Sequence, residues 1–237
     1  MFSYYGSKSK VIDYYPAPLK GKIIEPFAGS ARYSLKYFDR EVTISDKYKV
    51  IYDIWVWLQA ASEKDVLSLP FIPAGGRINR AELDTDAQYE LLRFMYQQGT
   101  PGGNKTYEWG CRRFLQNRRD IADNLFKIRH WKILNEDFTN LPNEEATWFI
   151  DPPYFQGGNR YKHSNKNLDY EKLSAYSKER DGQVIVCENS NASWMEFDPL
   201  CDLVGIRKKS TECMWTNIVP ETRLVQYDLF GNIHKMK

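Results

Sequence analysis

The stretch KIIEPFAGSA, residues 22–31, decides the fold. Residues 22–25 have the apolar, β-forming character of a short buried strand, and a turn with one proline and one glycine then leads into a helical pattern over residues 31–38. The stretch EVTISDKY, residues 41–48, repeats this order, with a strand that ends at Asp46 and a helical pattern after it. Two strand, loop and helix units in succession predict an α/β fold with a parallel sheet.

Further strand signals return only after a long interval. They lie at residues 132–134, 147–150, 183–187 and 222–227. A helical pattern that begins after Asp169 separates the second of these from the third. We therefore expect the sheet to resume in the second half of the chain.

The interval contains helical patterns joined by loops, and no strand pattern. One helical pattern covers residues 86–98, and a basic helix follows it. The apolar side of the basic helix consists of Phe114, Ile121, Leu125 and Ile128. We predict one main α/β domain formed by residues 1–62 and 132–237, with residues 63–131 inserted as a mainly helical subdomain.

The composition is that of a globular chain with a large aromatic share. Of 237 residues, 42% are hydrophobic, 27% charged and 15% aromatic, which is far from a disordered profile. No apolar run approaches the ~20 residues of a membrane span, and the first residues lack a signal-peptide core. The cysteines and histidines show no metal-ligand spacing. We expect a cytoplasmic protein without a membrane anchor, a disulfide framework or a metal site.

Basic residues concentrate in one region although the formal net charge is only +2. Residues 105–132 carry eight basic residues against three acidic ones. The arginines of this region that are spaced along one helix are Arg112, Arg113, Arg118 and Arg119. Such a charge run is either a solvated face or a surface for the phosphates of a nucleic acid.

Three predicted strands end in an acid: Glu25, Asp46 and Asp151. Ligands of open parallel sheets bind beyond the carboxyl ends of the strands, so we expect these acids to converge on one crevice. An acid after the second strand is typical of sheets that bind the ribose of a nucleoside. The first loop has one glycine where a dinucleotide fingerprint has three, which favours a nucleoside without phosphates.

The sequence WFIDPPYFQGG, residues 148–158, points to more specific chemistry. Prolines have no backbone donor and restrict the residues before them, so Asp151 and Pro152 are held extended at the end of a strand. The Asp151 carboxylate and the proline carbonyls then form a rigid rim of acceptors. Acceptors that pull on both hydrogens of an exocyclic amine favour the charge that builds on its nitrogen during attack on an electrophile. Tyr154 offers a face on which a planar base can stack. The alternative is an ordinary turn in which Asp151 caps the next element.

Together, these stretches resemble the Dam-type N6-adenine DNA methyltransferases, which use S-adenosylmethionine. The resemblance runs in order from the N-terminus to about residue 190. It rests on YYGSKSK at 4–10, IEPFAGSA at 24–31, ISD at 44–46, NEDF at 135–138 and DPPY at 151–154. It implies a Rossmann-like methyltransferase sheet with a mainly helical target-recognition insertion at residues 63–131.

The resemblance also implies a role for particular residues. Those implied to bind S-adenosylmethionine are Tyr4, Lys8, Glu25, Phe27, Gly29, Asp46, Asp137, Phe138 and Asp151. Lys8 is expected near the carboxylate end of the cofactor, Asp46 at the ribose, and Asp137 with Phe138 against the adenine ring. The implied catalytic motif is Asp151, Pro152, Pro153 and Tyr154. The family more often has a Trp and a Gly-Gly-Lys in its first motif, where this chain has Tyr4 and Gly6–Ser7–Lys8.

The implied activity is methyl transfer to N6 of an adenine extruded from double-stranded DNA, without a metal ion. Expected DNA contacts are Arg112, Arg113, Arg118 and Arg119, with Arg160 and Lys162 from the loop after DPPY. The same acceptor rim suits RNA adenine, cytosine N4 or a glutamine side chain. A catalytically silent DNA-binding relative would keep the same binding features, so these alternatives stay open on the sequence alone.

Overall fold

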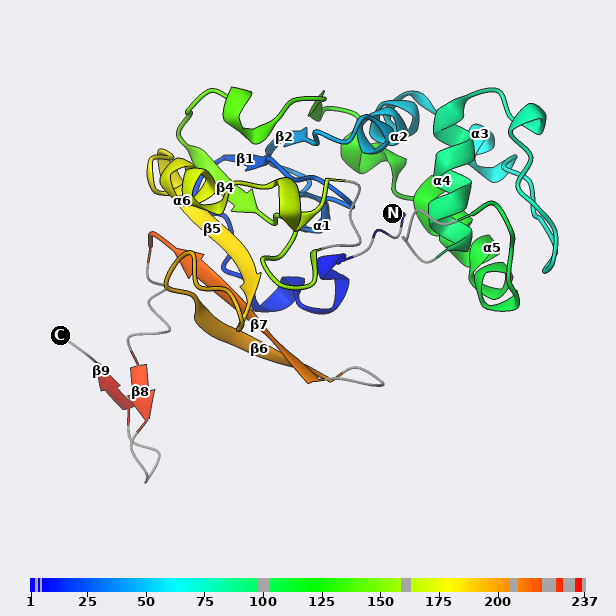
Figure 1. Ribbon diagram of the computed structural model, residues 1–237. Coiled ribbons are helices and arrows are strands. Elements are labelled where there is room, and N and C mark those ends of the chain that lie inside the picture. The colour runs from blue at the N-terminus through cyan, green and yellow to red at the C-terminus, as the bar shows by residue number, and fades with distance from the viewer. Residues whose placement is uncertain are drawn as a thin grey trace.

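The structure is a computed structural model that describes residues 1, 2, 4, 6–97, 103–158, 163–204, 209–218, 225–227 and 233–235. Its centre is a seven-stranded sheet with the order β3-β2-β1-β4-β5-β7-β6 (Figure 1). Strands β1 to β5 run parallel, so their carboxyl ends meet at one edge. Strand β7 is antiparallel to both β5 and β6.

The strands are β1 Lys22–Glu25, β2 Glu41–Ser45, β3 Lys132–Leu134, β4 Ala146–Ile150, β5 Gly182–Asn189, β6 Asp198–Val204, β7 Lys209–Thr216, β8 Val225–Tyr227 and β9 Ile233–Lys235. The α-helices are α1 Arg32–Lys36, α2 Lys49–Ala60, α3 Glu63–Leu67, α4 Asp86–Tyr96, α5 Glu108–Ala122 and α6 Tyr170–Lys178. Short 3₁₀ turns are η1 Lys8–Lys10, η2 Ile12–Tyr14, η3 Arg80–Glu82, η4 Leu125–Ile128, η5 Phe138–Asn140 and η7 Asn165–Asn167. None of the helices in the described part of the chain is both long and apolar enough to cross a membrane.

Strand β4 is buried throughout because helices cover both faces of the sheet. All five of its residues are buried, as expected for a central parallel strand. The side chains of Trp148 and Phe149 belong to different core clusters, one on each face. Trp148 meets Tyr176 of α6 edge to face at 6.0 Å, whereas Phe149 stacks on Tyr33 of α1 at 4.3 Å.

The strand predicted at residues 222–227 does not complete the main sheet. Residues 222–224 lie outside the described residues, and β8 pairs with β9 in a separate two-stranded sheet. The main sheet is completed by the β6 and β7 pair, so it is mixed and not wholly parallel. The sequence prediction missed this pair because β7 buries Glu212 beside Cys213 and Met214, and a charged buried residue hides the apolar pattern.

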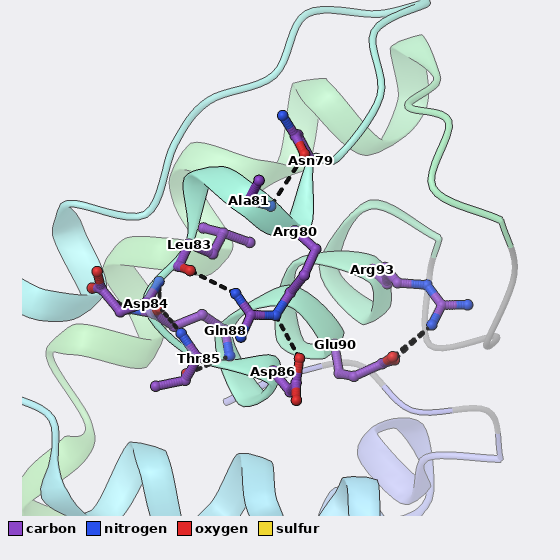
Figure 2. A network of polar contacts seen from close by, with 10 residues as sticks. All are labelled: Asn79, Arg80, Ala81, Leu83, Asp84, Thr85, Asp86, Gln88, Glu90 and Arg93. Carbon is purple, nitrogen blue, oxygen red and sulfur yellow. Dashed lines mark hydrogen bonds and ion pairs between the residues drawn. The ribbon is translucent and has the colours of Figure 1, made fainter.

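Two α-helices of the region between α2 and β3 begin with side-chain caps, whereas α5 has none. Ser62 and Asp65 form a capping box at α3, and Thr85 and Gln88 form another at α4. Figure 2 shows the contacts around the second box, where Arg80 pairs with Asp86 and also donates to the Leu83 carbonyl at 2.6 Å. Glu90 and Arg93 form an ion pair on α4 itself at 2.7 Å.

This region shares the main core of the protein. The Phe2 ring lies 5.2 Å from Trp55 of α2 and 6.2 Å from Phe94 of α4, measured between ring centroids. The four apolar residues predicted on the basic helix are all buried, but α5 ends at Ala122, so Leu125 and Ile128 lie on η4. That residues 63–131 act as a separate target-recognition subdomain stays a prediction.

Replacing Gly182 by alanine should destabilise the fold. Gly182 has φ +98°, and a Cβ there would lie 2.2 Å from the Ala146 carbonyl oxygen of β4. We expect Gly182→Ala to lower the free energy of unfolding by about 3 kcal/mol, from backbone strain and overpacking together. Chemical denaturation measures this change. Gly21→Ala is the matched control, because nothing lies within 4 Å of its added Cβ; equal stability of the two variants would contradict the prediction.

Candidate functional site

A cavity of about 300 Å³ lies at the carboxyl edge of the sheet. This volume is at the lower end of the range for small-molecule sites. Its walls come from the N-terminal segment, the ends of β1, β2 and β4, the turn η5 and the segment around η7. All nine residues predicted to bind the cofactor line it: Tyr4, Lys8, Glu25, Phe27, Gly29, Asp46, Asp137, Phe138 and Asp151. Their individual roles stay predictions.

The loop after β1 is shaped by close contacts of its backbone. Gly29 has φ +45°, and a Cβ there would lie 2.8 Å from the Tyr4 ring, so only glycine lets this ring pack on the loop. The Trp55 indole donates to the Gly29 carbonyl at 2.9 Å. Ala31 also has a left-handed backbone, with φ 44°. A non-glycine residue in this conformation marks a local constraint, of the kind found at binding sites.

Glu25 ties the end of β1 to the first turn of α1. Its carboxylate accepts a hydrogen bond from the Ser34 backbone N–H at 2.5 Å, which supplies the cap that Ala31 cannot provide. Burial raises the pKa of Glu25 to about 8. Glu25 is therefore largely neutral near pH 7 unless a positive charge enters the cavity.

Asp46 holds the loops after β1 and β2 together. One carboxylate oxygen accepts from the Gly29 N–H and the other from the Tyr48 N–H, each at 2.9 Å. Burial raises the pKa of Asp46 to about 6, against the lowering effect of these hydrogen bonds. Each carboxylate oxygen has a second lone pair, so Asp46 can still accept hydrogen bonds from a ligand hydroxyl.

Asp137 and two phenylalanines form the part of the cavity next to η5. Burial opposes ionisation of Asp137, but hydrogen bonds from Lys47 and Thr139 leave its pKa below the ordinary value. The ion pair with Lys47 has an N···O distance of 2.8 Å. The rings of Phe27 and Phe138 lie 5.4 Å apart with an interplanar angle of 31°. An aromatic wall beside an ionised acid can hold a planar ring with a donor group.

Asp151 follows β4 and is paired with the N-terminal segment. The Lys8 ammonium donates to its carboxylate at 2.6 Å, and the Asp151 side chain keeps 22% of its exposure. Burial raises the pKa of Asp151 to about 6, while the charge of Lys8 lowers it and that of Glu212 raises it. At neutral pH this carboxylate is ionised and faces the cavity.

The rest of the DPPY motif divides between the cavity and the protein interior. Pro153 lines the cavity, and its carbonyl accepts from the Tyr170 hydroxyl at 2.6 Å. Pro152 is buried and is not among the residues that line the cavity. Tyr154 lies beside the cavity with its hydroxyl on Glu212 and the Lys8 ammonium 4.5 Å from its ring centroid. The predicted stacking of Tyr154 on a base stays a prediction.

Two buried glutamates near this motif were not predicted from the sequence. Glu188 at the end of β5 accepts from the Phe155 N–H at 2.5 Å and from the Trp194 indole at 3.1 Å. Glu212 of β7 accepts from the hydroxyls of Tyr15 and Tyr154. The one available signal was an acid within a run of β-forming residues, in CEN and in TECMW, and this pattern alone does not indicate burial.

The four predicted DNA-contacting arginines of α5 have different environments. Arg118 donates to the Leu69 carbonyl at 2.5 Å and lies over the Phe114 ring, so it packs against the protein. Arg112 is exposed and pairs with Glu108 of the same helix. Arg119 is exposed. Arg113 lines a second cavity, and the predicted contacts Arg160 and Lys162 lie outside the described residues.

The second cavity, of about 370 Å³, lies between the N-terminal segment and α5. It adjoins the first cavity, since Tyr4, Gly6, Ser7 and Arg32 line both. Its charged lining residues are Lys10, Arg32 and Arg113. Trp109, 40% exposed, also lines it and stands parallel to Tyr107 with a centroid distance of 6.0 Å. Positive charge beside an exposed aromatic face suits a nucleic-acid strand.

Removing the charge of Lys8 should raise the pKa of Asp151 above about 6, because the ammonium lowers that pKa. The carboxyl ¹³C shift of Asp151, followed against pH in Lys8→Met, measures the change. Lys47→Met is the matched control, since Lys47 pairs with Asp137 instead. An Asp151 pKa that is the same in both variants would show that the ion pair does not control this carboxylate.

No protein-family model and no curated protein sequence matches the chain. Among solved structures, HI0767 of Haemophilus influenzae, a presumed methylase, is similar over 84% of this chain and 87% of its own, with 11% identity and a TM-score of 0.37. A presumed methyltransferase of Escherichia coli, yhhF, is similar over 87% of this chain and 78% of its own, with 11% identity and a TM-score of 0.34. The sheet order from β3 to β5 is the Rossmann-like one. The predicted α/β, Rossmann-like fold class is confirmed by this strand order, with a mainly helical region between β2 and β3.

Proposed function

We propose that this protein is an S-adenosylmethionine-dependent methyltransferase that modifies N6 of adenine in double-stranded DNA. The observation that carries the proposal is the position of the Asp151 carboxylate. It lies at the end of β4 and opens into the same cavity as Glu25, Asp46, and the phenylalanine pair Phe27 and Phe138. The residues that would bind a nucleoside and the carboxylate that would accept from an amine thus line one cavity.

The lining of the cavity fits the cofactor. Asp46 would accept hydrogen bonds from the ribose hydroxyls, and Phe27 with Phe138 would enclose the adenine ring beside Asp137. Glu25 and Asp151 place acids around the part of the cavity that would receive the cationic sulfur. When bound, S-adenosylmethionine supplies a methyl group activated by this positive charge.

Asp151 would act on the amine of the target base. Its carboxylate is ionised above its pKa of about 6, and a hydrogen bond from the amine to it stabilises positive charge on nitrogen as the new bond forms. The carbonyl of Pro152, the next residue in the chain, would be the second acceptor for the amine. Transfer would be direct, with no side chain as a nucleophile: the bond from the methyl carbon to sulfur would break as its bond to nitrogen forms, and the proton lost by the amine would pass through Asp151 to water.

The positive surface beside the cavity supports a nucleic-acid substrate. Lys10 and Arg113 would contact phosphates, and Trp109 offers a face to a base. The residues shared by the two cavities place this surface next to the cofactor cavity. An adenine extruded from a duplex held there would have a short path to Asp151.

Methyl transfer from labelled S-adenosylmethionine to unmethylated duplex DNA tests the proposed function. We expect N6-methyladenine, with a rate that falls as the pH drops through about 6, where Asp151 becomes protonated. Asp151→Asn should lower kcat by about 10²- to 10³-fold, because the amide has half the acceptor capacity and no charge. Exposed Asp39 gives the matched control, Asp39→Asn. Label in RNA or in cytosine would show that the substrate is not adenine in DNA. No label in any nucleic acid, despite cofactor binding, would refute the proposal.

Arg113→Ala should weaken duplex binding without changing cofactor affinity. If Arg113 neutralises one phosphate, the slope of log K against log salt should become shallower by about 0.9. Fluorescence anisotropy with a labelled duplex of mixed sequence gives the slope. Arg40→Ala, at an exposed position away from both cavities, serves as the control. Equal slopes for the two variants would show that Arg113 does not contact a DNA phosphate.

A further inference from the structure

Glu212 is a buried acid at the edge of the sheet where the site lies. It pairs in register with Asn189 at the end of β5 and is 4% exposed. One carboxylate oxygen accepts from the Tyr15 hydroxyl at 2.6 Å and from the Tyr154 hydroxyl. The same oxygen lies 3.6 Å from the Lys8 ammonium. Glu212 therefore joins the N-terminal segment, β7 and the DPPY motif at one atom.

These contacts hold the Tyr154 ring at two points. Its hydroxyl is fixed on Glu212, and its face lies against the Lys8 ammonium at 4.5 Å. Lys8 in turn donates to Asp151 at 2.6 Å. If the Glu212 carboxylate moved, Lys8 would move with it and would shift Asp151. Tyr154 would also move, and the DPPY motif would shift directly.

A buried carboxylate at this position costs folding free energy, which indicates that the residue has a role other than packing. A buried charge is costly unless its partners satisfy it, and an apolar residue would fill the same space at less cost. The partners of Glu212 are two hydroxyls and one ammonium. Two of these three groups, from Tyr154 and Lys8, belong to the site that we assign to methyl transfer.

We propose that Glu212 is a positioning residue for methyl transfer, which holds Lys8 and Tyr154 so that the Asp151 carboxylate is fixed relative to the amine. The inference rests on the proposed function. Glu188 acts on the next residue of the same loop, because it accepts from the Phe155 N–H at 2.5 Å. Together, the acids of β5 and β7 fix the loop after β4 at consecutive residues.

Glu212→Gln tests the role without emptying the site, because the amide oxygen can still accept from the hydroxyls. We expect kcat to fall by about tenfold for Gln, and by about 100-fold for Glu212→Ala, since small displacements of reacting groups cost that much. Tyr15→Phe is the matched control: it removes a buried hydroxyl from the same oxygen but leaves Tyr154 in place. It should lower kcat by less than about threefold.

A double-mutant cycle identifies the path of the effect. If Glu212 acts through Tyr154, the variant that combines Glu212→Gln with Tyr154→Phe should lose no more kcat than the worse of the two single variants. Additive losses in folded proteins would overturn this path. A wild-type kcat for Glu212→Gln, in a variant that is folded by circular dichroism, would overturn the inference as a whole.

A measurement without turnover separates failure of this inference from failure of the proposed function. The negative charge of Glu212 raises the pKa of Asp151, so Glu212→Gln should shift the ¹³C titration of Asp151 below its value of about 6. The titratable groups that face Asp151 are Lys8, Glu25, Glu188, Glu212, Tyr154 and Tyr15, with the Cys187 thiol. An unchanged titration would refute coupling between the two acids, whatever the substrate. A shifted titration in a protein that methylates no nucleic acid would refute only the proposed function.

Discussion

The ion pair between Lys8 and Asp151 is the contact on which the cavity depends. It joins residues 143 positions apart in the chain and fixes the N-terminal segment against the end of β4. That segment then supplies Tyr4, which packs on Gly29, and so forms a wall that the strands alone cannot provide. The parallel strands bring the acids to one edge, but the ion pair closes the space above them.

Much of the fold could be predicted because its signals are local. Strands β1, β2 and β4 are short apolar runs that end at a turn or an acid, and the sequence places each within one residue of its observed bounds. Strands β6 and β7 could not be predicted, since β7 buries a charged residue whose partners lie elsewhere in the chain. Tyr15 and Tyr154 are 197 and 58 positions from Glu212, and no local pattern records such pairings.

In the candidate site, too, features with a local sequence signal could be predicted, and features that depend on distant contacts could not. Seven of the nine predicted cofactor residues share one cavity because they lie at the carboxyl ends of β1 to β4 or in the turns after them, and the ion pair of Lys8 with Asp151 brings Tyr4 and Lys8 to the same place. Among the basic residues, a charge run identified α5 but could not separate Arg118, which bonds to the Leu69 carbonyl, from Arg113, which lines the second cavity. Helical spacing gives the face of a side chain only when the packing around the helix is known.

The raised pKa of Glu25, about 8, has a thermodynamic consequence for any cationic ligand of the cavity. Near neutral pH this carboxyl is mostly protonated, and an approaching positive charge favours its ionised form. Binding would then be coupled to the release of a proton into the buffer. The observed binding enthalpy would vary with the ionisation heat of that buffer, and affinity would increase with pH until Glu25 is ionised in the free protein as well.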